Sequence, residues 1–387
     1  MHTCRKNSES RPFKLNARQS GFSTSNNRAL FETARMPRKL SAIDHDNPPM
    51  HLLIPFAASH SPECRQALAT LKLPNLDKLL RKLRLADADT GDENTLSPPH
   101  ERALAAAQGI GTADGELPWG AWHALQAGRA VAPGEAWGVI TPCHWAVQTN
   151  HIILTNPKDL NLSEEESRAL MAAMNPYFAE DGITLMYDTP TRWLARGEVF
   201  AGLATASPDR VIGRPVDDWI PKGAAAKGLR RLQQEMQMLL YTHALTEVRS
   251  GRGLLAVNSF WVSGTGALPL QRVSAGPRQT APTHVQVTVP VTLRDAAVRE
   301  DWAAWAEAWQ VIDANACAAL LAALATDGAA ALTLCGERNA QRFEYPLDSN
   351  ICHKSSKNGK NHMLTGVFDR ILSILRPQLS NNILSSL

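Results

Sequence analysis

Short apolar runs alternate with longer amphipathic segments along most of the chain. The short runs have the length and period of β-strands, and we expect strands at residues 51–56, 136–140, 145–148, 151–154, 184–187, 192–195, 256–262, 285–291, 331–335 and 342–345. The longer segments place apolar residues on one helical face, and we expect helices at residues 61–71, 75–85, 97–108, 229–248, 301–325 and 368–375. A further helix is expected to begin at Ser163, where Glu166 completes a capping-box pattern.

The order of these elements predicts the fold class. Strands separated by helices, with several hairpins, indicate a mixed α/β fold. We expect a mainly doubly wound sheet with helices on both faces and antiparallel hairpins added to it. Valines occupy every second position of residues 285–291, and Pro290 within this run favours the edge of a sheet.

Changes in polarity suggest the domain boundaries. Residues 1–49 are polar and basic without apolar periodicity, which predicts a disordered leader. We expect the folded body to span residues 50–346 and to begin at Met50, with an inserted subdomain at about 136–225. Residues 347–387 are expected to form a polar tail with one short amphipathic helix.

Composition narrows the class of protein. The chain has 387 residues with 40 basic and 37 acidic side chains, for a net charge of +3. It has no basic stripe interleaved with aromatics, so we expect no nucleic-acid partner. We find no stretch of about 18 uncharged apolar residues, so we expect no membrane partner. The six cysteines show no framework spacing, which favours reduced thiols and a cytoplasmic location.

The strongest candidate for ligand binding is the segment 258–266. We interpret residues 263–266 as a glycine turn at the end of a strand, where backbone amides can approach an anion. An ordinary buried strand and turn is the alternative. The candidate ligand-binding residues here are Asn258, Ser259, Ser263, Gly264 and Gly266.

Two arginines provide a second candidate. Arg210 and Arg214 flank a short turn, and planar guanidinium groups suit phosphate or carboxylate. They are either ligand-binding residues or surface charges. His243 and Arg249 precede the 256–262 strand and are expected to converge with them.

The sequence gives less support to a calcium site or to a catalytic Cys–His pair. The acidic segment 87–93 is expected to be a loop, and its twelfth position is Pro98 rather than the bidentate glutamate of a calcium loop. Cys143 and His144 are adjacent in a strand, so they should face opposite ways. We therefore predict no metal site and no evident cofactor, and we assign no catalytic residue.

Four segments resemble a poorly characterised proteobacterial family. They are residues 96–101 (LSPPHE), 205–214 (TASPDRVIGR), 231–243 (RLQQEMQMLLYTH) and 257–266 (VNSFWVSGTG). Members of this family are labelled hypothetical proteins, regulatory proteins of the pathogenicity-factor type, or cofactor-independent phosphoglycerate mutases. Residues 74–79, Arg249, Gly253 and 258–266 are also similar to archaeal-type phosphoglycerate mutases, and this resemblance implies an alkaline-phosphatase-like fold.

The chain departs from that superfamily at its metal ligands. Those enzymes use two divalent metal ions, with an aspartate after the first strand and later Asp and His ligands. Here Pro55, Phe56 and Ala57 follow the first strand, and Asp295 and Asp301 stand without a neighbouring histidine. Phosphoryl transfer needs such charge to stabilise its transition state.

We therefore expect a catalytically degenerate mutase-like protein with a binding or regulatory role, whose partner is a phosphorylated or carboxylate small molecule. One alternative is an active metal-dependent mutase or phosphohydrolase, which would bind two divalent metal ions. The other is an interaction module that uses exposed tryptophans to bind a protein partner, which the sequence does not identify.

Overall fold

The computed structural model describes residues 50–270, 286–326, 330–346 and 379–387, all of which belong to one compact unit, His45–Leu387. The expected leader at 1–49, the expected helix at 368–375 and most of the tail lie outside the described residues. Every expected strand overlaps a strand of the structure. The mixed α/β class is confirmed.

A five-stranded sheet has the order β2-β11-β10-β1-β9. Its strands are β1 (Met50–Ile54), β2 (Arg84–Asp89), β9 (Gln286–Thr288), β10 (Ala330–Cys335) and β11 (Ala340–Glu344). β1 is parallel to both β10 and β9, whereas β11 is antiparallel to β10 and β2. β10 is buried throughout, as expected for a strand inside a parallel sheet, and β9 lies at the edge that Pro290 predicted.

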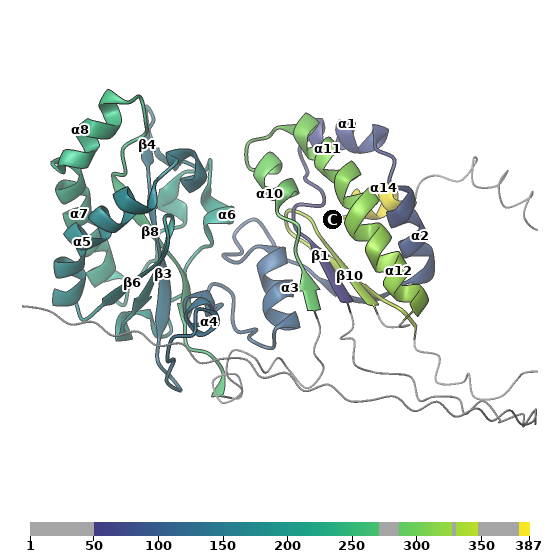
Figure 1. The fold of residues 1–387 in the computed structure, drawn as a ribbon, viewed down its shortest axis with the longest axis horizontal. Coiled ribbons are helices and arrows are strands. Elements are labelled where there is room, and N and C mark those ends of the chain that lie inside the picture. Colours follow the sequence, from purple (N-terminus) through teal and green to yellow (C-terminus); the bar gives the residue numbers. More distant parts are fainter. Residues whose placement is uncertain (1–49, 271–285, 327–329, 347–378) are drawn as a thin grey trace, which may run out of the picture. The chain divides into compact units, whose positions relative to one another are not determined.

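Helices cover one face of this sheet (Figure 1), and the main apolar core lies between them and the strands. The covering helices are α1 (Pro62–Thr70), α2 (Pro74–Lys82), α11 (Trp302–Ile312), α12 (Ala318–Thr326) and α14 (Leu379–Leu384). Trp305 and Trp309 are fully buried there against Leu52 and Leu332. α3 (Pro99–Ala107) packs on the opposite face.

α11 and α12 continue into each other through the π-helical turn Asp313–Cys317. By length and composition alone, the continuous helix Trp302–Thr326 matches a membrane-crossing helix, a test that core helices of soluble proteins also pass. Asp313 anchors its middle to α2, because its carboxylate accepts the backbone N–H groups of Asn75 (3.2 Å) and Leu76 (2.7 Å).

A second sheet has the order β6-β7-β3-β8 and is entirely antiparallel. Its strands are β3 (Trp137–Cys143), β6 (Thr184–Thr189), β7 (Arg192–Arg196) and β8 (Ser259–Gly266). The expectation of one mainly doubly wound sheet is therefore wrong, because the strands divide between two sheets. β8 pairs along β3, so this sheet includes a strand beyond residue 225, where the expected inserted subdomain ends. The inserted subdomain at about 136–225 stays a prediction.

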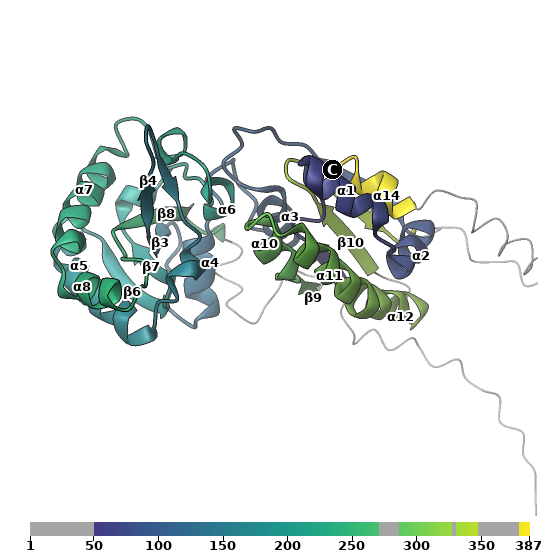
Figure 2. The same cartoon turned by 90° about the horizontal axis from the view of Figure 1, so that it is seen from above.

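Helices cover both faces of the second sheet (Figure 2). α5 (Glu164–Glu180), α7 (Lys227–Tyr241) and α8 (Ala244–Gly251) lie on one side, and α4 (Trp119–Gln126) lies on the other. Ser163 and Glu166 form the predicted capping box of α5. The remaining elements are the hairpin β4 (Trp145–Val147) and β5 (Ile152–Leu154), the helices α6 (Pro208–Val211) and α10 (Thr292–Ala297), and the 3-10 turns Pro157–Leu160, Glu198–Phe200 and Val216–Asp218.

Three local predictions are corrected. The expected acidic loop at 87–93 begins as β2, which pairs with β11. The expected helix 229–248 is two helices, α7 and α8, separated at Thr242 and His243. The expected turn at 263–266 lies inside β8, because the positive φ of Gly264 (62°) is accommodated within the strand.

Candidate functional site

A cavity of about 550 Å³ lies at the carboxyl ends of the parallel strands β1 and β10. Ligands commonly bind at this edge of an α/β sheet. We call it the strand-end cavity. It is lined by the segments after both strands, the start of α3, and parts of α6 and α10. Its charged and histidine side chains are His60, His100, Asp209, Arg210, Arg214, Arg299, Glu300, Glu337 and Arg338.

Glu337, in the segment after β10, organises one side of this cavity. Its carboxylate accepts hydrogen bonds from the backbone N–H of His60 (3.2 Å) and from Arg214 Nη2 (3.1 Å). His60 Nδ1 lies 3.3 Å from the same oxygen as its own backbone N–H. Burial by itself would raise the pKa of Glu337, but the His60 N–H and the Arg214 charge hold that pKa below its ordinary value.

Arg210 is 4% exposed, and all of its hydrogen bonds to described residues go to backbone oxygens. Its guanidinium donates to the carbonyls of Thr95 (2.7 Å), Asp92 (2.8 Å), Glu93 (2.9 Å) and Glu337 (3.2 Å). Within the described part of the chain, no carboxylate lies within ion-pair distance of it. Arg210 therefore fixes the two neighbouring loops while leaving its positive charge without a carboxylate partner.

Asp209 lies at the centre of a half-buried polar cluster at the wall of the cavity. It pairs with Arg294 from α10, whose Nε lies 2.9 Å from each carboxylate oxygen, and with His100 Nε2 at 3.3 Å. Burial would raise the pKa of Asp209, but the His100 hydrogen bond and the Arg294 charge together hold it well below its ordinary value. Asp209 is therefore a carboxylate at neutral pH.

Glu101 is a second carboxyl group in the same cluster. It accepts hydrogen bonds from Ser207 Oγ (2.5 Å) and from Trp119 Nε1 (3.2 Å). Burial raises its pKa, and the nearby charge of Asp209 adds to that increase. Glu101 and Arg294 also line a separate cavity of about 450 Å³, which we call the α4 cavity.

His100, Glu101 and Asp209 place three potential metal-ligand atoms within 4.8 Å of one another. Both Asp209 oxygens already bind Arg294, and the raised pKa of Glu101 disfavours its anionic form. Among the described residues, this is the one group of three that could hold an ion. These residues do not fit the two-metal centre of the superfamily, which needs several free carboxylates.

The predicted site residues of the segment 258–266 have mostly structural contacts. Asn258 clamps β4, because its side chain accepts the N–H of Trp145 (2.7 Å) and donates to the carbonyl of Trp145 (3.0 Å). Ser259 Oγ accepts from Gln237 Nε2 (3.3 Å). Ser263 and Gly264 line the α4 cavity. A Cβ at Gly264 would lie 2.9 Å from Trp119 Cβ, and one at Gly266 would lie 3.2 Å from the carbonyl of Glu116.

Of the other four predicted residues, the structure brings only Arg210 and Arg214 to the strand-end cavity. His243 caps α8 by accepting the backbone N–H of Leu245 on Nδ1 (3.2 Å). Arg249 is 1% exposed and pairs with Glu166. The expected convergence of His243 and Arg249 with the arginine pair is therefore wrong, since both anchor α8 within the second sheet's helical layer.

Four residues of the strand-end cavity and its polar cluster are not among the predicted site residues, namely His60, His100, Arg294 and Glu337. Glu337 and Arg294 follow the predicted strands 331–335 and 285–291, so the rule that ligands bind beyond strand ends could have singled them out. His100 occurs in the LSPPHE segment, but its partner Asp209 is more than 100 residues away in the sequence, and no local pattern joins the two.

The chain was compared with protein families, curated proteins and solved structures. No family model matches it, and no curated protein matches it. It is similar to the cofactor-independent phosphoglycerate mutase from Thermoplasma acidophilum, with 12% identity, a TM-score of 0.33, and coverage of 78% of this chain and 90% of that one. It is also similar to the PH0037 protein from Pyrococcus horikoshii, with 11% identity, a TM-score of 0.40, and coverage of 77% and 87%. These distant structural similarities leave an alkaline-phosphatase-like fold as a prediction, and the function has to be inferred from the chain's own side chains.

Proposed function

We propose that the protein binds a small phosphorylated or carboxylate anion in the strand-end cavity and serves a binding or regulatory role rather than a catalytic one. The observation that carries this proposal is the charge of Arg210, which has no carboxylate within ion-pair distance among the residues that the structure describes. Three further arginines from separate segments line the same cavity, namely Arg214, Arg299 and Arg338. Each of these is between 40% and 50% exposed at its side chain, so each can reach a ligand.

The nucleophiles near this cavity are not set up for covalent catalysis. Ser61 Oγ accepts the backbone N–H of Cys64 (3.0 Å) at the start of α1, and Ser59 Oγ points to Glu337 (3.5 Å). Burial raises the pKa of the Cys64 thiol to about 11, which keeps it protonated. None of these groups is paired with a histidine base in the way that nucleophilic catalysis requires.

We expect 3-phosphoglycerate, which carries both a phosphate and a carboxylate, to bind the wild-type protein in a calorimetric titration. The Arg214→Ala, Arg338→Ala double variant should bind it at least about tenfold more weakly, because each lost charge-assisted hydrogen bond costs about 1.5–3 kcal/mol. Arg196→Ala is the matched control, since Arg196 is similarly exposed (47%) and has one carboxylate partner, but lies on β7. Absence of binding, or equal affinity in the double variant, would contradict the proposal.

The metal-dependent alternative draws its support from the grouping of His100, Glu101 and Asp209. We expect the purified protein to contain well below one equivalent of manganese, zinc or magnesium, because Arg294 already neutralises Asp209. We also expect no mutase or phosphomonoesterase turnover that a chelator abolishes. Stoichiometric metal together with turnover that a chelator abolishes would contradict the proposed binding role and support metal-dependent catalysis.

The tryptophans give no support to an interaction module. All ten tryptophans of the sequence lie in the described ranges, and none is exposed. Trp137, Trp193, Trp261, Trp305 and Trp309 are each at most 1% exposed. Their side chains stabilise the cores, so a surface for a protein partner would have to use other residues.

A further inference from the structure

A cavity of about 300 Å³ opens on the face of the five-stranded sheet that α3 covers. We call it the sheet-face cavity. The strand register places Thr333 of β10 opposite Arg342 of β11, and Arg342 opposite Asp87 of β2. His51 of β1 reaches the same row, with Nε2 at 2.8 Å from Thr333 Oγ1.

This polar row contrasts with the opposite face of the same strands. There the side chains of Leu52, Leu332 and Phe343 belong to the main apolar core. Burying polar groups costs free energy unless they are hydrogen-bonded. A row of polar side chains inside a sheet therefore needs partners, and the structure leaves two of its donors without them.

His51 is the more buried of the two, with 1% exposure. Its Nδ1 has no hydrogen-bond partner among the described residues. Burial and the neighbouring Arg342 charge lower the pKa of His51 to about 4, so the imidazole is neutral at pH 7. When the Thr333 hydroxyl donates to Nε2, the ring proton resides on Nδ1, which is then a hydrogen-bond donor.

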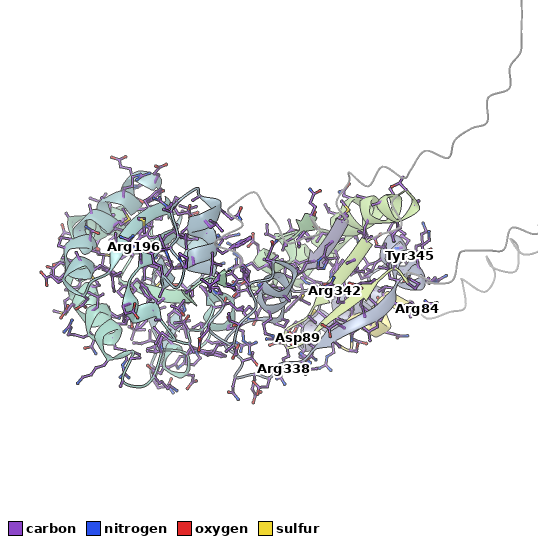
Figure 3. All side chains as sticks on the ribbon, turned by 90° about the horizontal axis from the view of Figure 1, so that it is seen from below. Arg84, Asp89, Arg196, Arg338, Arg342 and Tyr345 are labelled. Carbon is purple, nitrogen blue, oxygen red and sulfur yellow. The ribbon has the colours of Figure 1, made fainter. Side chains whose placement is uncertain are left out.

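Arg342 contributes the second donor. Its Nη2 binds Glu344 at 2.6 Å, but its Nε is buried and has no partner in the described ranges. Figure 3 shows Arg342 over the sheet, with Asp89 further along the same face. Arg342 Nε and His51 Nδ1 are thus two unpartnered donors of this lining, and the two oxygens of a ligand carboxylate can match them, one oxygen for each donor.

The other residues that line the cavity indicate which further chemical groups the ligand has. Asp87 is exposed, and the one hydrogen bond of its side chain to a described residue comes from the adjacent backbone N–H of Ala88. Asp89 is already paired with Arg102 at 2.7 Å, and Asp114 accepts the N–H groups of Leu96 and Ser97. The apolar part of the wall is formed by Ala103, Ala106, Leu117 and Ala340.

The charges of this cavity disfavour a simple anion. Its lining includes three aspartates, Asp87, Asp89 and Asp114, against two arginines, Arg102 and Arg342. This excess of negative charge would repel a phosphate dianion. A ligand that carries one anionic and one cationic group matches the cavity better, because its anionic group can bind Arg342 and His51 and its cationic group can bind Asp87. We propose that the sheet-face cavity binds a free amino acid, with its carboxylate on Arg342 and His51, its ammonium group on Asp87, and its side chain against the alanine wall.

This site is distinct from the strand-end cavity, and its test does not depend on the proposed function. Each standard L-amino acid is added at millimolar concentration to the full chain, and thermal unfolding is recorded. We expect at least one amino acid to raise the unfolding temperature, because a ligand that binds only the folded state stabilises it. No shift with any of them would overturn the proposal.

The best amino acid is then titrated by calorimetry beside its des-amino and decarboxylated analogues, and both analogues should bind at least about tenfold more weakly. Arg342→Gln should weaken binding of the amino acid by a similar factor. Asp87→Asn should weaken the amino acid but leave the des-amino analogue unchanged, which a variant that merely perturbs folding would not do.

Arg84→Gln is the matched control, because Arg84 lies on β2 but does not line the cavity. Its affinity for the amino acid should equal that of the wild type. Equal affinity of the amino acid for the wild type and Arg342→Gln, or equal affinity of the amino acid and its des-amino analogue, would overturn the assignment.

Discussion

Replacement of Arg249 by methionine is expected to lower the free energy of unfolding by about 3–5 kcal/mol, the usual cost of breaking a buried ion pair. The Arg249 guanidinium binds Glu166 and the carbonyl of Leu160, and donates to the carbonyl of Leu255 at 2.9 Å. Methionine retains much of the side-chain volume but leaves the Glu166 carboxylate, which is 11% exposed, without its buried partner. Urea denaturation at neutral pH measures the loss.

Arg252 provides a matched control on the same carboxylate. It pairs with the other oxygen of Glu166 at 3.2 Å, but its side chain is 61% exposed. Because exposed ion pairs contribute little, Arg252→Met should cost less than about 1 kcal/mol. A similar small loss in both variants would show that Arg249 does not hold α8 in place.

The same pair of variants tests the prediction that Arg249 binds a ligand. Arg249→Met protein that remains folded should bind 3-phosphoglycerate as the wild type does, because Arg249 lines neither the strand-end cavity nor the α4 cavity. Weaker binding of 3-phosphoglycerate without loss of secondary structure would instead show that Arg249 contributes to ligand binding, as the sequence predicted.

The sequence predicted elements better than it predicted their grouping. Strand and helix positions follow from apolar periodicity, which is local, and the capping box at Ser163 and the edge position of β9 follow from single residues. Which strands share a sheet depends on contacts far apart in the sequence. β1 pairs with β10 across about 280 residues, and no local pattern encodes that pairing.

In the candidate site, too, local features could be predicted from the sequence and contacts between distant segments could not. Arg210 and Arg214 were identifiable because two arginines flank one turn. The chemical state of Arg210 depends on carbonyls more than 100 residues away, so its structural role could not be predicted. The prediction of a turn at residues 263–266 was wrong for a related reason. The glycines there allow a close approach of the backbone to the start of α4, which lies far away in the sequence. Ligand binding by Ser263 and Gly264 stays a prediction.

We expect Asp209→Asn to lower the free energy of unfolding by about 3 kcal/mol at neutral pH. The variant leaves Arg294, whose side chain is 19% exposed, with Asp295 at 3.1 Å as its one acidic partner among the described residues. Because the folded-state pKa of Asp209 is depressed, its contribution is fully present above the unfolded-state pKa of about 3.9. That contribution is lost as the pH falls toward the folded-state value. The difference between wild type and variant, measured by urea denaturation, should therefore shrink as the pH falls below about 5.

Glu101→Gln should show the opposite pH dependence, although its carboxyl group belongs to the same cluster. The folded-state pKa of Glu101 is raised, so the folded wild type binds this proton more tightly than the unfolded chain does. Its ionisation then costs stability as the pH rises above the unfolded-state value of about 4.3. Glutamine cannot ionise, and the variant should gain stability relative to the wild type over that rise. Parallel pH profiles for the two variants would contradict the assignment of one anionic and one protonation-prone carboxyl group. Burial outweighs the His100 charge at Glu101, whereas His100 and Arg294 together outweigh burial at Asp209, so the two pKa values move in opposite directions.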